Sequence, residues 1–133
     1  MSFIMVGLLV SLIAWLVNRY FVINLGSAGL IAVAPILEEV LKTGGAVLLG
    51  ADIFFVHAFF GAAEAVIDIN TGAHSKSAGI LSFLGHLLFG YLAAVAYHIA
   101  NIWWALIAGI VVHILWNFSI VLLVSMRNKG DLQ

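Results

Sequence analysis

The sequence is short of charged residues and has no cysteine. Its 133 residues include 5 Lys or Arg and 6 Asp or Glu, whereas about a quarter of the residues in a soluble globular protein are charged. The absence of cysteine excludes disulfide bonds and thiolate metal sites. A net charge of −1 without a basic run gives no basis for a nucleic-acid partner. A water-soluble enzyme is therefore excluded.

In place of charged residues, the sequence contains long apolar runs. Hydrophobic residues make up 65% of it, and apolar runs of about 17 to 25 residues, the length of a membrane-spanning helix, recur from end to end. This pattern predicts an all-α, polytopic transmembrane helix bundle of about five spans, at residues 3–18, 28–49, 53–69, 79–98 and 102–125. We expect one integral membrane domain over residues 1–133, with its motifs in residues 28–125, in a multi-pass protein of the plasma membrane surrounded by lipids.

Turn and cap residues separate these predicted spans. Asn18 begins a polar stretch that is typical of an interfacial helix end, and Gly26 supplies a break before the second span. Asp52 and Asn101 are predicted to cap the third and fifth helices. Pro35 removes one backbone hydrogen bond and is predicted to disturb the second helix.

Basic residues predict the orientation. An odd number of spans puts the termini on opposite sides, and Arg19, Lys76, Arg127 and Lys129 then all fall on the side of the C-terminus. Because basic residues in short loops stay in the cytoplasm, the C-terminus is predicted to be cytoplasmic and the N-terminus outside.

Several polar side chains fall inside the predicted spans, where an ionisable residue costs about 2.5 kcal/mol or more. Counted from the predicted cytoplasmic ends at about 1.5 Å per residue, they lie roughly 10 to 20 Å deep on four helices, which favours one shared site. By contrast, His57 and His98 are expected near the outer face as interfacial residues. The buried set is Glu38, Glu39 and Lys42 in the second span, Glu64 in the third, His86 in the fourth, and His113 and Asn117 in the fifth.

The two adjacent glutamates are not expected to point the same way. Neighbouring residues on a helix diverge by about 100°, so one of Glu38 and Glu39 can face the site while the other pairs with Lys42 or holds a neighbouring helix. His113 and Asn117 are four residues apart and share one helix face.

Four short motifs, one in each of four successive spans, resemble those of a known family. They are EExxK at Glu38 to Lys42, FxxxE at Phe60 to Glu64, a His-Leu-Leu-Phe-Gly segment that opens at His86, and HxxxN at His113 to Asn117. In this order they look like the PrsW family of intramembrane proteases, which are relatives of the type II CAAX prenyl endopeptidases. The resemblance implies hydrolysis of a peptide bond in a transmembrane or lipidated peptide substrate by a glutamate-based mechanism with no cofactor.

The resemblance also implies roles for single residues. Glu38 would activate water, and Glu64 would take the place of the assisting His of the CAAX branch. His113 and Asn117 would present donors to the oxyanion, and His86 would be a second base or a water ligand. With Glu39, these residues form the predicted catalytic set.

The residues by themselves leave other interpretations open. Glu38, Glu64, His86 and His113 are also a plausible ligand set for a divalent metal such as zinc. The same polar groups could form structural ion pairs and interhelical hydrogen bonds in a non-catalytic scaffold subunit of the same superfamily. Chains of Glu and His also carry protons, so a proton-translocating or ion-translocating membrane protein is a third hypothesis.

Overall fold

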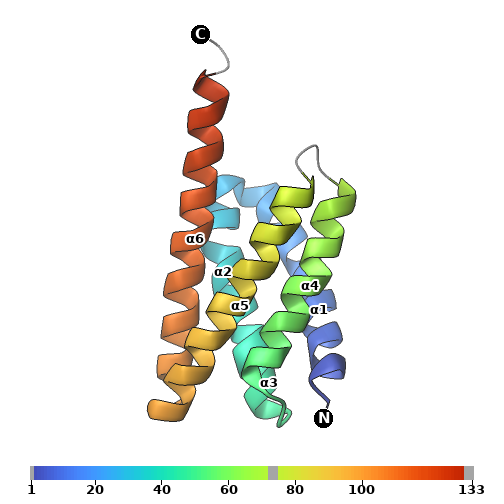
Figure 1. Cartoon of the computed structure of the whole chain (residues 1–133), viewed down its shortest axis with the longest axis vertical. Coiled ribbons are helices and arrows are strands. Elements are labelled where there is room, and N and C mark those ends of the chain that lie inside the picture. Colours follow the sequence, from blue (N-terminus) through green and yellow to red (C-terminus); the bar gives the residue numbers. More distant parts are fainter. Residues whose placement is uncertain (1, 72–74, 131–133) are drawn as a thin grey trace.

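A computed structural model describes residues 2–71 and 75–130, and the described chain is built from helices (Figure 1). Four of them are long: α1 (Phe3–Leu25), α4 (Ile53–Thr71), α5 (Ser75–Ile99) and α6 (Ile102–Gly130). Between α1 and α4 lies an irregular helical segment made of η1 (Gly29–Val33), α2 (Ala34–Glu39), η2 (Val40–Gly44) and α3 (Gly45–Leu48). The predicted all-α bundle is confirmed.

The four long helices could each span a membrane. Each of them contains a stretch that is long and apolar enough to cross a membrane. The irregular segment from Gly29 to Leu48 is roughly 30 Å long at the usual helical rise, which is about the thickness of the hydrocarbon layer. The length and composition of the four long helices thus make the chain an integral membrane protein. That the irregular segment also crosses the membrane, as a fifth span, remains a prediction.

The two termini lie at opposite ends of the bundle (Figure 1). This arrangement agrees with an odd number of passes. Which of the two ends faces the cytoplasm remains a prediction from the basic residues.

Regular α-helical geometry is interrupted on both sides of α2. Directly before Pro35, the N–H of Ala34 donates to the carbonyl of Gly29, five residues back, which makes a π turn. A second π turn follows Glu39. Such turns are frequent at functional sites, and these two flank the predicted carboxylates.

The caps agree with the sequence prediction, but the end of the first helix does not. Asp52 Oδ1 accepts the N–H of Phe55 at 3.1 Å, and Asn101 Oδ1 accepts the N–H of Trp103 at 3.0 Å. The expected end of the first helix at residue 18 is wrong, because α1 continues to Leu25. It ends where Gly26 adopts a φ of 55°, a conformation that favours glycine.

The fourth and fifth predicted helices are also longer than expected. Helix α5 begins at Ser75 instead of residue 79, and α6 runs to Gly130 instead of residue 125. Polar residues do not by themselves stop a helix, because most of them have a helix propensity within about 0.7 kcal/mol of alanine.

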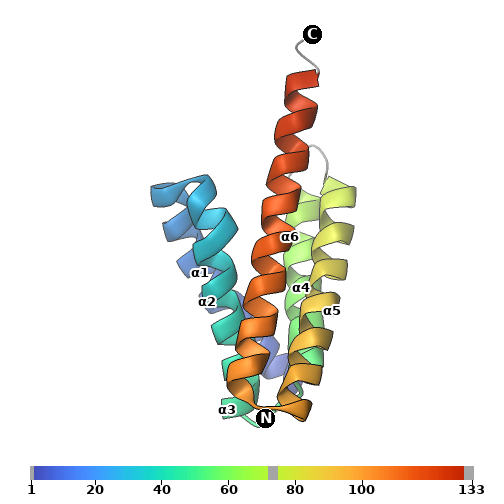
Figure 2. The ribbon, with the colours of Figure 1, turned by 90° about the vertical axis from the view of Figure 1, so that its left-hand side faces the viewer.

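Inside the bundle, apolar and polar side chains form separate clusters. Val6, Val10, Val56 and Phe60 form an apolar core in which α1 meets α4. Helices α1 and α2 lie on one side of the molecule and α4 and α5 on the other, with α6 beside both α2 and α5 (Figure 2). The buried polar side chains come from α2, η2, α4, α5 and α6, so the polar centre is enclosed by helices from both sides.

Candidate functional site

One cavity gathers most of the predicted site residues. It has a volume of about 320 Å³ and lies among α1, α2, α4, α5 and α6. Five of the six predicted catalytic residues line it, whereas Glu39 does not. Those on its wall are Glu38, Glu64, His86, His113 and Asn117, joined by the polar residues Asn18, Asp68 and Ser82 and by the aromatic residues Phe89 and Trp116.

Glu38 is the best-placed base of this cavity. Its side chain is only 5% exposed, and its Oε1 accepts a hydrogen bond from Asn18 Nδ2 at 2.5 Å. Its Oε2 lies 3.5 Å from Lys42 Nζ and 3.9 Å from His113 Nε2. The ammonium of Lys42 favours the ionised form of this carboxylate, and an ionised carboxylate within hydrogen-bond reach of a water in the cavity can take a proton from it.

Glu64 and His86 form a second pair on the opposite wall. His86 Nε2 lies 2.6 Å from Glu64 Oε2, and Ser82 Oγ donates to the same oxygen at 2.7 Å. Glu64 is 37% exposed, so it also faces the open part of the cavity. The pair depends on Gly61, since a Cβ at that position would lie 2.6 Å from His86 Cβ and push α4 and α5 apart.

Glu39 has a different environment from Glu38, as expected for neighbours on a helix. It is fully buried, with Lys42 Nζ 2.7 Å and His113 Nδ1 3.0 Å from its Oε1. A Cβ on Gly109 would lie 2.5 Å from Glu39 Oε2, so only glycine lets α6 approach so closely. Glu39 therefore neutralises Lys42 and holds α6 in place instead of facing the cavity.

The hydrogen bonds of His86 and His113 indicate which of their ring nitrogens donate and which accept. Lys42 Nζ is 3.0 Å from His86 Nδ1 and can only donate, so this nitrogen accepts while Nε2 donates to Glu64. His86 is thus engaged at both nitrogens. Because His113 donates from Nδ1 to Glu39, its Nε2 is an acceptor in the neutral ring. A neutral His113 suits a proton acceptor beside Glu38 better than the oxyanion donor that the resemblance implies.

Asn117 joins the cavity wall to the first π turn. Its Nδ2 donates to the carbonyl of Leu30 at 3.0 Å. An amide nitrogen carries two hydrogens, which leaves one N–H of Asn117 for an occupant of the cavity. The residue can tie α6 to η1 and still serve as an oxyanion donor.

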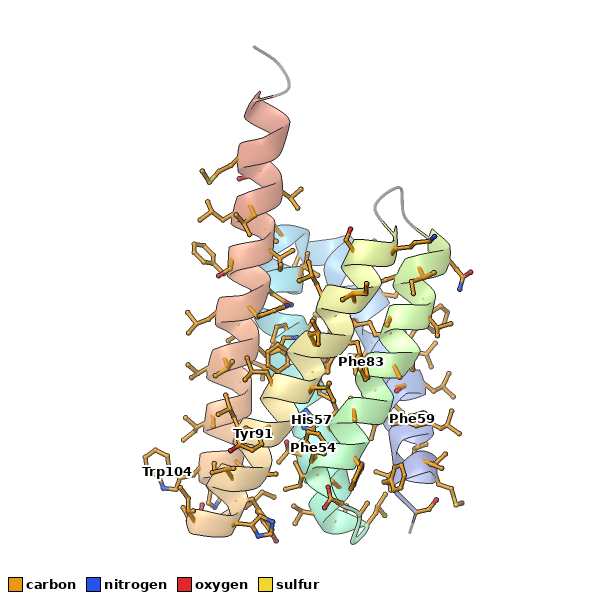
Figure 3. All side chains as sticks on the ribbon, viewed as in Figure 1. Phe54, His57, Phe59, Phe83, Tyr91 and Trp104 are labelled. Atoms are coloured by element: carbon orange, nitrogen blue, oxygen red, sulfur yellow. The ribbon has the colours of Figure 1, made fainter. Side chains whose placement is uncertain are left out.

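The expectation that His57 is interfacial is wrong. Its side chain is fully buried, with Nε2 3.1 Å from Thr43 Oγ1 and 3.7 Å from Glu39 Oε2 (Figure 3). Gly90 makes room for it, because a Cβ there would lie 2.5 Å from His57 Cβ. The available signal was the helical spacing that puts His57 on the same face as Glu64. His98, by contrast, is exposed as expected.

Asn18 was missed as a site residue for a related reason. The sequence places it at a helix end, whereas α1 continues for almost two more turns and brings its amide against Glu38. The presence of Gly26 as the real helix terminator was the signal that could have corrected this.

Two groups of buried side chains have the ligand types and spacing for a metal ion. Their ligand atoms lie within 4.8 Å of one another, and Glu64, which the sequence places in the ligand set, is in neither group. Lys42 Nζ contacts Glu38, Glu39 and His86, so an ammonium already neutralises members of both groups. A metal ion there would be repelled by this charge. The groups are Glu38, His86 and His113, and Glu39, His57 and His86.

Comparison with known proteins finds no match for this chain among family models, curated proteins or solved structures.

Proposed function

We propose that the protein is an intramembrane endopeptidase of the PrsW type, which hydrolyses a peptide bond of a membrane-embedded or membrane-proximal substrate. The observation that carries the proposal is the meeting of Glu38, Glu64, His86, His113 and Asn117 on the wall of one cavity. These residues come from four helices, so their convergence is a property of the fold and not of local sequence.

In the proposed reaction a water molecule lies between Glu38 and His113 and loses a proton to Glu38. Its oxygen bonds to the carbonyl carbon of the substrate, and the oxyanion accepts the free N–H of Asn117. The carbon–nitrogen bond then breaks, and the proton held by Glu38 passes to the leaving amine. The pair of Glu64 and His86 holds the opposite wall, where the partly exposed carboxylate of Glu64 accepts a backbone N–H of the substrate.

Cleavage by the purified protein in lipid vesicles tests this proposal. A panel of synthetic transmembrane peptides and prenylated peptides is incubated in water enriched in ¹⁸O, and mass spectrometry reads both the products and the label in the new carboxyl group. We expect cleavage that Glu38→Gln abolishes and Asp52→Asn retains, since Asp52 is an exposed helix cap. Absence of cleavage by the natural sequence across the panel contradicts the proposal and favours the non-catalytic scaffold.

We propose a metal-independent mechanism, since Lys42 already supplies positive charge between the candidate ligands. The metal content of the purified protein and the effect of a chelator on cleavage test this point. Activity that is lost with a chelator and restored by zinc contradicts it, and would assign Glu38, His86 and His113 as the ligands.

A proton relay is the second candidate, and a specific observation favours it. A chain of polar groups runs from Glu64 through His86, Lys42 and Glu39 to His57, with contacts of 2.6, 3.0, 2.7 and 3.7 Å between successive side chains. Such chains can pass protons through a membrane.

Proton flux into vesicles loaded with a pH-sensitive dye tests the relay. A relay predicts a flux that His57→Gln abolishes and that His98→Gln, at an exposed position, leaves unchanged. A protease without transport predicts no flux above that of empty vesicles, and cleavage that depends on Glu38 more than on His57.

A further inference from the structure

A second hollow lies between α1 and α4 and faces the surrounding lipid. It has a volume of about 480 Å³, and we call it the α1–α4 groove. The two helices touch at their other ends, where a Cβ on Gly7 would lie 2.7 Å from the ring of Phe59, and they separate toward the end of α1 (Figures 2 and 3). The wall is formed by Ser11, Trp15, Asn18, Arg19 and Ile23 of α1 and by Phe60, Ala63, Glu64, Ile67 and Asp68 of α4.

The groove leads to the site. Asn18, Glu64 and Asp68 line both the groove and the cavity that contains Glu38. Trp15 and Ile23 on its outer edge are 46% and 72% exposed, as expected for side chains that face lipid. An occupant that enters from the bilayer would therefore reach Glu38 without crossing water.

Two oxygen atoms of the groove wall lack partners. Ser11 Oγ and Asn18 Oδ1 are shielded from solvent and find no hydrogen-bond partner among the residues that the structure describes. A polar atom left unpaired in an apolar setting costs free energy, and the amide oxygen can only accept, so it requires a donor. Rotation about the Cα–Cβ bond turns the Ser11 hydroxyl toward an occupant of the groove, and Asn18 already lines the groove while its Nδ2 bonds to Glu38.

We propose that the α1–α4 groove binds an extended segment of a membrane polypeptide, whose backbone N–H groups bond to Asn18 and Ser11 as the segment passes toward Glu38. The proposal rests on the protease function and names the form in which the substrate enters. Ser11 and Asn18 are seven residues apart, about 10 Å along the helix, a distance that roughly three residues of extended chain cover.

The unpaired oxygens of the groove wall favour an extended polypeptide over two other occupants, a lipid acyl chain and a continuous helix. A lipid acyl chain carries no hydrogen-bond donor and would leave both oxygens unpaired. A continuous helix uses its own N–H groups internally and is about 10 Å or more in diameter with its side chains. Only an unwound segment offers free backbone N–H groups in an otherwise apolar chain.

Photocrosslinking in phosphatidylcholine vesicles tests the groove without any need for catalysis. Because the chain has no cysteine, Ala63→Cys in the Glu38→Gln background places one benzophenone probe in the groove, and Val111→Cys places one on the exposed face of α6. The probes are two synthetic transmembrane peptides of equal composition, one with a central glycine-rich break and one with a continuous helix. We expect the broken peptide to be captured at Ala63→Cys at least about fivefold better than the continuous one, and equally at Val111→Cys.

Four further variants test the assigned hydrogen bonds. Asn18→Leu and Ser11→Ala should each lower capture about fivefold, the effect of one lost hydrogen bond. Asn24→Leu and Ser119→Ala should not, because these side chains bond to carbonyls of their own helices. Ser11 lies outside the catalytic set, so its variant remains informative if Asn18→Leu fails to fold.

Three outcomes overturn the proposal: equal capture of both peptides, capture of phosphatidylcholine alone, or no effect of Ser11→Ala and Asn18→Leu. Failure of the groove is distinct from failure of the protease. Cleavage by the natural sequence without capture in the groove rejects only the entry route, whereas capture without cleavage rejects only the enzymatic activity.

Discussion

Glu38 and Glu39 are neighbours in the chain with the same side chain, yet they have opposite surroundings. Glu38 reaches a cavity and is held by Asn18 at its edge. Glu39 is fully buried between Lys42 and His113 and has no access to the cavity. The comparison shows that two adjacent helical residues can supply one group that faces a cavity and one that supports the packing beneath it, because adjacent side chains leave a helix in different directions.

The same division extends to the whole polar centre. On the cavity side, Glu64 is partly exposed and can meet a substrate. On the closed side, Thr43 and His57 are fully buried and pair with each other. A functional role is expected for the first side and a structural role for the second, and the following variants separate the two.

Loss of Glu38 should have the largest effect on activity. Glu38→Gln keeps the size of the side chain but removes the base, so cleavage in vesicles should fall by about 10⁴-fold. Thermal unfolding in detergent should be almost unchanged, because glutamine can still accept the hydrogen bond of Asn18. Cleavage within tenfold of the natural sequence would exclude Glu38 as the base.

Loss of Glu39 should have the largest effect on stability. Glu39→Gln leaves Lys42 buried without its closest counter-charge and should lower the free energy of unfolding in mixed micelles by about 3–5 kcal/mol. The double variant Glu39→Gln with Lys42→Met should recover part of this loss, because it removes the buried ammonium together with its closest counter-charge, while Glu38 loses its contact with Lys42. Equal stability of Glu39→Gln and the natural sequence would show that the ion pair is not structural.

Asn117 should affect catalysis more than folding. Asn117→Ala removes the proposed oxyanion donor and should lower kcat by about 10²-fold or more, with KM nearly constant. Asn70→Ala is the matched control, because Asn70 bonds to a carbonyl of its own helix at an exposed position. A parallel loss of stability and activity in Asn117→Ala would instead assign the residue to the bond with Leu30 alone.

Gly109 should give the smallest of these effects. Gly109→Ala places a methyl group against Glu39 and should lower the free energy of unfolding by about 1–3 kcal/mol. Gly44→Ala, with open space around the new Cβ, should leave stability unchanged or raise it by up to about 1 kcal/mol. If both variants unfold alike, the contact between α6 and Glu39 is not tight.

Much of the fold could be predicted because apolar runs of membrane length have few alternatives to helices. The caps at Asp52 and Asn101 could be predicted for a local reason, since each side chain bonds to a backbone N–H two or three residues ahead. The end of α1 could not, because a polar residue such as Asn18 can sit at an interface or point into a bundle, and local sequence does not distinguish these places.

Most members of the candidate site were predictable, but their roles were not. Polar residues at a shared depth indicated that Glu64, His86 and His113 meet, and all three line one cavity. The sequence does not show that His57 is buried, because a position near the outer end of α4 does not reveal which side chains of other helices pack there. Nor could it place Asn18 against Glu38, a contact between residues 20 apart.

The sequence by itself determined that this chain is an all-α membrane protein with costly polar groups in its interior, since composition and run length fix how a chain partitions between water and lipid. Only the tertiary structure decided which glutamate faces the cavity, which nitrogens of His86 and His113 accept hydrogen bonds and where α1 leaves α4. Those features depend on distances between helices, and the absence of a Cβ at Gly61, Gly90 and Gly109 allows the helices to approach this closely.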